Sequence, residues 1–184
     1  MIYNMDFLIS AMVILLLILW HFLGQKRAED LNNRVFLFFA VLGTADVVAE
    51  FFTNYYITSY NSDMENAAVI VTTIFYLLQA LLPVTFIFYI QTLHEQKIIS
   101  AKKMFISGVP TLVLISVILT NPFTEKLFSF DVTAGYMKGP WYLLMYVSAL
   151  GHFAVALLLI LLWRKKLGPQ KEKILLEIFV ISGV

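Results

Sequence analysis

Cysteine is absent from this chain of 184 residues. Without cysteine the chain can form no disulfide, no thiolate metal site and no cysteine nucleophile, so three classes of site are excluded. Charged residues are also scarce, at 14% of the sequence, and they sum to a formal net charge of +1. Because so few cations cannot build a large basic surface, we expect no nucleic-acid partner.

The short motifs of common enzymes are absent as well. The sequence contains no phosphate-binding loop, no G-x-S-x-G nucleophile motif and no dinucleotide-binding glycine pattern. His94 and Glu95 look like the start of a zinc-binding H-E-x-x-H motif, but Ile98 occupies the position of the second histidine. We therefore expect no catalytic residue, no metal ion and no cofactor, and we do not expect this segment to be an enzyme.

Long apolar segments take the place of these features, since 60% of the residues are hydrophobic. A membrane-spanning helix needs about 20 mostly apolar residues, and five segments meet that length. They are Phe7–Leu23, Val35–Phe52, Ala67–Ile90, Met104–Leu119 and Trp141–Trp163. A sixth begins near Ile174 and covers only about 16 Å by Val184, so we expect a longer protein. The predicted fold class is an all-α, polytopic transmembrane helix bundle forming one domain, residues 1–184.

The positions of the cations predict the orientation of these helices in a cell membrane. Cytoplasmic loops retain Lys and Arg, and eleven of the thirteen cations flank the first, third and fifth connections. The second connection has none, and the fourth has only Lys126 and Lys138. This asymmetry predicts an extracellular N-terminus, and it places the fourth connection outside as well.

The fourth connection, residues 120–140, is the longest polar interruption of the apolar segments. Asn121-Pro122 is expected to end the preceding helix, because proline lacks an N–H, and Gly139-Pro140 to begin the next. Several side chains between these points are too apolar for a solvated linker. They are Phe123, Leu127, Phe128, Phe130 and Tyr136. We expect them to fold back onto the membrane surface or the helix ends.

A resemblance to a known family is strongest in this region. Asn-Pro-Phe from Asn121, an acidic and aromatic middle, and Tyr-x-x-Gly-Pro-x-Tyr from Tyr136 resemble the multi-helix sensor regions of bacterial GGDEF diguanylate cyclases and histidine kinases. The resemblance implies a completed sixth helix, a seventh, and a cytoplasmic GGDEF domain or, second, a histidine kinase. The 184 residues contain neither a GGDEF motif nor a kinase H-box.

Two acidic residues lie inside the second apolar segment. Asp46 and Glu50 are four positions apart, so they share one helix face, about 18 and 24 Å from Arg34 at the inner surface. A carboxylate facing lipid costs several kcal/mol, which predicts that both face the bundle interior. The pair is interpreted either as structural hydrogen-bonding groups or as a sensing site.

Other polar residues are predicted at the same depth, in the outer half of the bundle. Helix three carries Thr72, Tyr76 and Gln79 on one face, and helix five carries Tyr142 and Tyr146. Together with Asp46 and Glu50 they form the candidate ligand-binding or sensing site, although such residues also serve only to hold bundles together. His152 is deep enough in helix five to contact Gln79 or a proton path.

Two functions remain open from the sequence. The first is a membrane-embedded sensory module that passes an extracellular or intramembrane signal to a cytoplasmic effector. The second is a small-molecule transporter or the substrate-binding membrane subunit of one, although the paired helix breaks of inverted repeats are not seen. The bilayer is the expected partner in both, while a small-molecule ligand at the outer half and a homodimer are left open.

Overall fold

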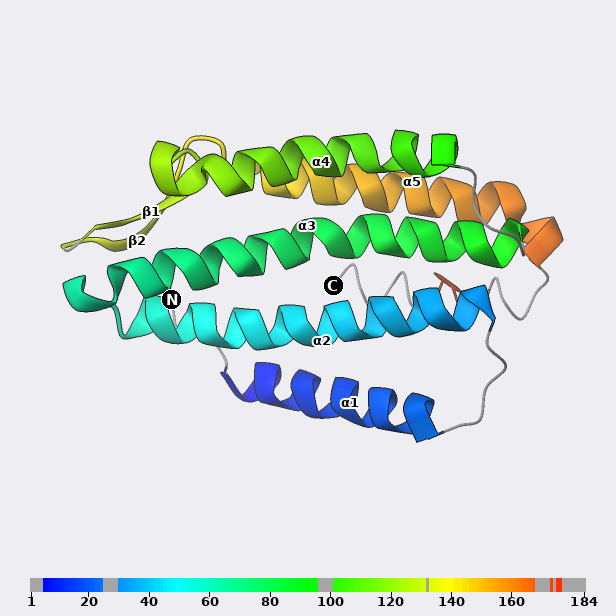
Figure 1. Ribbon diagram of the computed structural model, residues 1–184, viewed down its shortest axis with the longest axis horizontal. Coiled ribbons are helices and arrows are strands. Elements are labelled where there is room, and N and C mark those ends of the chain that lie inside the picture. Colours follow the sequence, from blue (N-terminus) through cyan, green and yellow to red (C-terminus); the bar gives the residue numbers. More distant parts are fainter. Residues whose placement is uncertain are drawn as a thin grey trace.

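Five long helices make up most of the computed structural model, which describes residues 5–24, 30–95, 101–131, 133–167, 173, 175 and 176 (Figure 1). They are α1 (Met5–Gly24), α2 (Leu31–Thr58), α3 (Glu65–Glu95), α4 (Ala101–Thr124) and α5 (Leu143–Leu167). Each is long and apolar enough to cross a membrane. The chain is therefore a helical bundle of the multi-pass membrane type, as its hydropathy predicts. Its orientation stays a prediction, and most of the expected sixth helix lies outside the described residues.

Helix α3 is the central element of the bundle. It packs against α2 on one side and against α4 and α5 on the other, whereas α1 packs against α2 (Figure 1). The helices therefore run from α1 at one edge, through α2 and α3, to the α4 and α5 pair at the opposite edge. A displacement of α3 would reach every other helix either directly or through α2.

Helix α4 continues past the point where the sequence predicts its end. The prediction that Asn121-Pro122 stops this helix was wrong, because α4 runs on to Thr124. Proline at this position removes a single hydrogen bond in the last turn, which the helix tolerates. Glu125 directly follows the helix and ends it, because its φ of 53° is left-handed, and its N–H donates to the Asn121 carbonyl over 2.8 Å.

The fourth connection contains a short β-hairpin, whereas the bundle itself is all-α as predicted. Strand β1 (Phe128–Asp131) pairs antiparallel with β2 (Gly135–Lys138), with Phe130 opposite Tyr136. The carboxylate of Asp131 accepts hydrogen bonds from the backbone N–H groups of Thr133 and Ala134, over 2.8 and 2.9 Å, and so closes the turn. Local turn chemistry and cross-strand aromatic pairing together stabilise this hairpin.

Two apolar clusters lie at different levels of the bundle, and α3 contributes to both. We name them the outer and the inner cluster after the orientation that the cations predict. The outer cluster contains Tyr76, Ala80, Leu114, Ile118, Leu127, Phe128 and Met145. The inner cluster contains Phe86, Ile87, Ile90, Ala156, Ile160 and Leu175. Leu175 follows α5 in the chain and is fully buried. Leu175 thereby belongs to the same cluster as Phe86, Ile87 and Ile90 of α3.

Candidate functional site

Tyr76 is the centre of the outer cluster. Its hydroxyl lies 2.6 Å from the hydroxyl of Tyr136 on the hairpin, and its side chain is only 5% exposed. Its ring also contacts the ring of Phe128, at 5.3 Å between centroids, and the edge of Tyr142, at 6.3 Å. One side chain of α3 therefore joins the hairpin to the start of α5.

Asn121 holds the hairpin on the end of α4. It is 1% exposed, and its Oδ1 accepts hydrogen bonds from the backbone N–H groups of Leu127, at 2.7 Å, and Phe128, at 3.3 Å. Its Nδ2 donates to the Phe128 carbonyl over 3.0 Å. The sequence assigned Asn121 only a role in ending the helix. These hydrogen bonds to the hairpin could not be predicted, because their partners are known only once the loop has folded.

Gly139 allows the two ends of the loop to approach each other. Its N–H donates to the Leu127 carbonyl over 2.8 Å, and the next hydrogen bond runs from Trp141 N–H to the Lys126 carbonyl, also 2.8 Å. A Cβ on Gly139 would stand 2.2 Å from that same Lys126 oxygen. Only glycine fits this close approach of two backbone segments. The approach therefore explains the glycine at position 139 better than the predicted role in beginning a helix.

The hairpin also contacts the turn between α2 and α3. The ring of Phe130 stacks on Tyr60 at 5.1 Å between centroids. Tyr60 precedes the short 3-10 helix η1 (Ser62–Met64) that leads into α3. The hairpin is thus held by α3, by α4 and by the α2–α3 turn.

The two tyrosines predicted on helix five occupy different environments. Tyr142 is half-buried against Tyr76, and Lys138 lies over its ring at 4.4 Å. Tyr146 contacts Tyr142 at 5.4 Å between ring centroids, but it is 51% exposed. The structure therefore brings Tyr142 into the outer cluster and leaves Tyr146 at its edge.

The predicted polar face of helix three divides in the same way. Thr72 and Tyr76 are buried, whereas Gln79 is exposed. His152, predicted to be deep enough to contact Gln79, instead receives the hydroxyl of Thr111 at its Nε2, over 2.9 Å. Its Nδ1 donates to the Ser148 carbonyl over 2.7 Å. Both ring nitrogens thus have partners, and His152 bridges α4 and α5.

The acid pair belongs to the interface between α2 and α3. Three contacts define the register of these antiparallel helices: Phe36 with Tyr89, Phe39 with Phe86, and Gly43 with Leu82. From one pair to the next, the α2 residue lies three or four positions later in the chain, and the α3 residue lies the same number of positions earlier.

Extended by the same steps, this register brings Asp46 level with Gln79 and Glu50 level with Phe75. The Oδ1 of Asp46 is buried and has no hydrogen-bond partner. This carboxylate oxygen is therefore shielded by the bundle, as the cost of exposing it to lipid requires. The candidate residues thus fall into two sets, the acid pair between α2 and α3 and the tyrosines beneath the hairpin.

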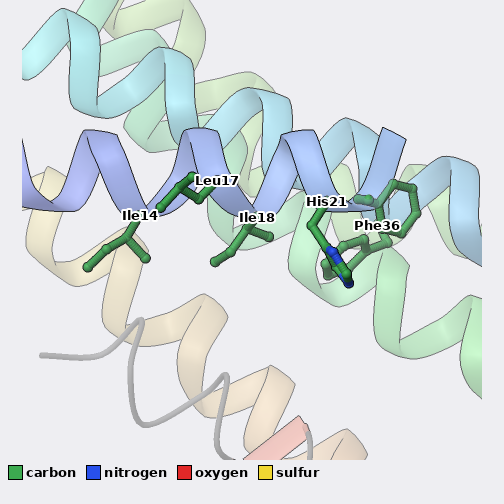
Figure 2. A pocket seen from close by; sticks show the side chains of 6 residues that line it. Ile14, Leu17, Ile18, His21 and Phe36 are labelled. Carbon is green, nitrogen blue, oxygen red and sulfur yellow. The ribbon is translucent and has the colours of Figure 1, made fainter. Parts of the chain in front are cut away.

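Two other features of the described residues bear on a possible site. Within the described residues, no three His, Asp or Glu side chains converge as metal ligands would. An apolar groove between α1 and α2 is lined by Ile14, Leu17, Ile18, His21, Phe22 and Phe36 (Figure 2). With a single polar side chain in its lining, the groove offers little to orient a polar ligand.

Comparison with family models, with curated proteins and with solved structures finds no match to this chain.

Proposed function

We propose that the chain is the membrane-embedded sensory input module of a bacterial signalling protein. It receives an extracellular or intramembrane signal in its outer half and passes it to a cytoplasmic effector encoded beyond these 184 residues. The loop motif favours a GGDEF diguanylate cyclase as that effector, with a histidine kinase second. The observation that carries the proposal is that α3 contributes both to the outer cluster, through Tyr76, and to the inner one, through Ile90.

A signal requires two arrangements that a ligand binds with different affinity. The hairpin is the element that we infer to take two positions, since the bond between Tyr76 and Tyr136 joins it to α3 and the ring contact between Phe130 and Tyr60 joins it to the α2–α3 turn. A ligand that competes for these hydroxyls would release the hairpin from α3. Since side chains of α3 pack at both levels, the change would reach Leu175 and the chain that follows it.

The first test is the reading frame beyond Val184, together with the orientation of the helices. An open frame that encodes a cyclase or kinase domain is expected. Reporter fusions at Ser62 and Ala134 should be active only outside the cell, and fusions at Asp30 and Pro169 only in the cytoplasm. A cytoplasmic reading at Ala134 would overturn the proposal, because the hairpin could then meet no extracellular signal.

The second test measures the output of the full-length protein. Tyr76→Phe removes the hydroxyl that bonds Tyr136 and should shift the basal level of cyclic di-GMP, or of phosphotransfer, at unchanged expression. Tyr55→Phe is the matched control, since Tyr55 is 46% exposed and lies outside the outer cluster. Equal output from both variants and the parent would refute a sensing role for the outer cluster.

A transporter is the second candidate, and buried polar atoms without partners on α2 and α3 favour it. Groups of this kind mark substrate and ion pathways through membranes. A stop codon directly after Val184, combined with solute uptake by reconstituted vesicles, would support this function. Failure of the vesicles to take up any cation or small solute would leave the sensory proposal in place.

A further inference from the structure

The threonines of α2 and α3 follow a rule that has two exceptions. A threonine in a helix commonly donates its hydroxyl to the carbonyl three or four residues earlier. Five of those on α2 and α3 do so: Thr44, Thr58, Thr73, Thr85 and Thr92. The exceptions are Thr53 and Thr72, whose hydroxyls are buried without any hydrogen-bond partner. Their side chains are 3% and 0% exposed.

These two threonines lie at the same level of the bundle. The register defined by Gly43 and Leu82, extended by steps of three and four residues, brings Thr53 opposite Thr72. The Nδ2 of Asn54 is a third buried polar atom without a partner, and Asn54 is 3% exposed. Glu50 lies one helical turn away on the same face of α2. Three unpartnered polar atoms of the described residues therefore lie at one level of the α2–α3 interface, while others, such as Asn32 Oδ1 and Gln91 Oε1, lie elsewhere.

The charge of this region has a single sign. No Lys or Arg occurs from Val35 to Gln96 in the sequence, a range that holds all of α3 and all of α2 after Arg34. Asp63 and Glu65 are exposed at the turn that joins the two helices. Thr53 is five residues from the end of α2 at Thr58, or about 8 Å along the helix axis. Acidic groups thus line the approach from that turn and would concentrate cations there.

We propose that Glu50, Thr53, Asn54 and Thr72 form a binding site for a small monovalent cation. The ion is an alkali metal ion or the ammonium group of a small amine, since both take oxygen ligands. Hydroxyl oxygens, an amide oxygen and one carboxylate can replace the water around such an ion. The Asn54 side chain presents its oxygen once the amide rotates by half a turn.

The donor set explains the choice of a single positive charge. One carboxylate among neutral oxygens balances one charge, whereas divalent ions in proteins are held by more carboxylates or by retained water. Asp46, one turn before Glu50 on α2, also has a buried oxygen without a partner, but it lies outside this donor set. The expectation of no metal, drawn from the sequence, rested on His, Asp and Glu and did not weigh hydroxyl ligands.

This site deepens the proposed function by assigning its ligand a chemical class, but its binding test stands alone. The experiment follows thermal unfolding of the purified full-length protein in NaCl, in methylammonium chloride and in N-methylglucamine chloride at equal ionic strength. The melting temperature should rise by a few degrees, in a saturable manner, with Na⁺ or with methylammonium. It should not rise with the bulky glucamine cation. The salt that raises the melting temperature shows whether the ligand is an alkali metal ion or the ammonium group of an amine.

Matched variants locate the ion. Thr72→Val keeps the shape of the side chain and removes the hydroxyl, and it should weaken the apparent affinity ~10-fold or more, as should Glu50→Gln. Thr73→Val is the control, because its hydroxyl donates to the Val69 carbonyl over 2.7 Å and is not free for a ligand. The proposal is overturned if the small cation raises the melting temperature equally in Thr72→Val and Thr73→Val. It is also overturned if neither small cation raises the melting temperature of the parent protein.

A chemical test covers the case in which these variants fail to fold. The absence of cysteine lets a single Thr53→Cys substitution report accessibility without background. A cationic methanethiosulfonate reagent should modify it, and the small cation that stabilises the parent should slow the reaction. Ser62→Cys, at an exposed position of the turn between α2 and α3, should react at a rate independent of that cation. The site is rejected if the cysteine at position 53 is not modified, or if the small cation does not slow its modification.

The two proposals fail separately. If the cation binds but leaves the output of the full-length protein unchanged, the site stands and the sensory function is lost. If the output responds to extracellular additives while no cation binds, the function stands and the assigned ligand is wrong.

Discussion

The hydroxyls of Tyr76 and Tyr136 lie 2.6 Å apart, although 60 positions separate them in the chain. This contact joins the central helix to the tip of a hairpin that lies outside the spanning segments. Because one residue belongs to α3 and the other to β2, the bond reports directly whether the hairpin is closed on the bundle.

Removal of either hydroxyl should therefore loosen the hairpin. Tyr76→Phe or Tyr136→Phe is expected to lower the free energy of unfolding by about 1 kcal/mol, the usual value of a hydrogen bond between neutral groups. The double variant should cost less than the sum of the two single ones, because both remove the same bond. Unfolding of the purified protein in detergent measures all three, and strict additivity would contradict a direct bond.

Gly139 should tolerate no side chain. Gly139→Ala places a methyl group 2.2 Å from the Lys126 carbonyl oxygen, so the backbone must move. A loss of about 2 kcal/mol or more in the free energy of unfolding is expected. Gly151→Ala provides the comparison, since a Cβ there meets nothing within 4 Å and alanine is the better helix former. Similar melting temperatures for the two variants would disprove the close approach.

Asn121 should matter more than an ordinary residue of a last helical turn. Asn121→Ala leaves the Leu127 N–H and the Phe128 carbonyl without their partner, at an expected cost of about 2 to 4 kcal/mol. Asn121→Asp keeps the acceptor and loses only the donor, so it should be the milder change. Asn66→Ala, at an exposed position of α3, should have little effect in the same unfolding assay.

The hairpin turn should weaken in acid. Hydrogen bonds from the Thr133 hydroxyl and from the backbone N–H groups of Ala134 and Thr133 lower the pKa of Asp131 below its ordinary value of 3.8. A carboxyl whose folded pKa is depressed contributes stability at neutral pH, and that contribution is lost as pH falls below 3.8 through the folded value.

Hydrogen exchange of the Thr133 and Ala134 amides measures this loss. Their protection, corrected for intrinsic exchange rates, should fall through that pH range in the parent protein. In Asp131→Asn the protection should be independent of pH there, because the amide does not titrate. A parallel decrease in both proteins would show that another group controls the turn.

The spanning helices could be predicted from the sequence because hydrophobicity over about 20 residues is a local property. Their ends could not. Residues 53–58 and 120–124 are polar enough to suggest loops, yet they continue α2 and α4, and the hydroxyls of Thr58, Thr120 and Thr124 donate to carbonyls of the preceding turn. Asn121 shows why, since its amide is an ordinary end-of-helix group until the hairpin supplies both of its partners.

The amino-acid sequence by itself determined that this protein is a bundle of membrane-spanning helices, and it identified Asp46, Glu50, Tyr76 and Tyr142 as candidate residues. Only the tertiary structure decided that Tyr76 meets Tyr136 and that Thr53 lies level with Thr72. Helical periodicity gives the face that a residue occupies, but the register between two helices depends on side-chain packing along the whole interface. Contacts such as those of Gly43 and Phe39 define that register, and no local pattern encodes it.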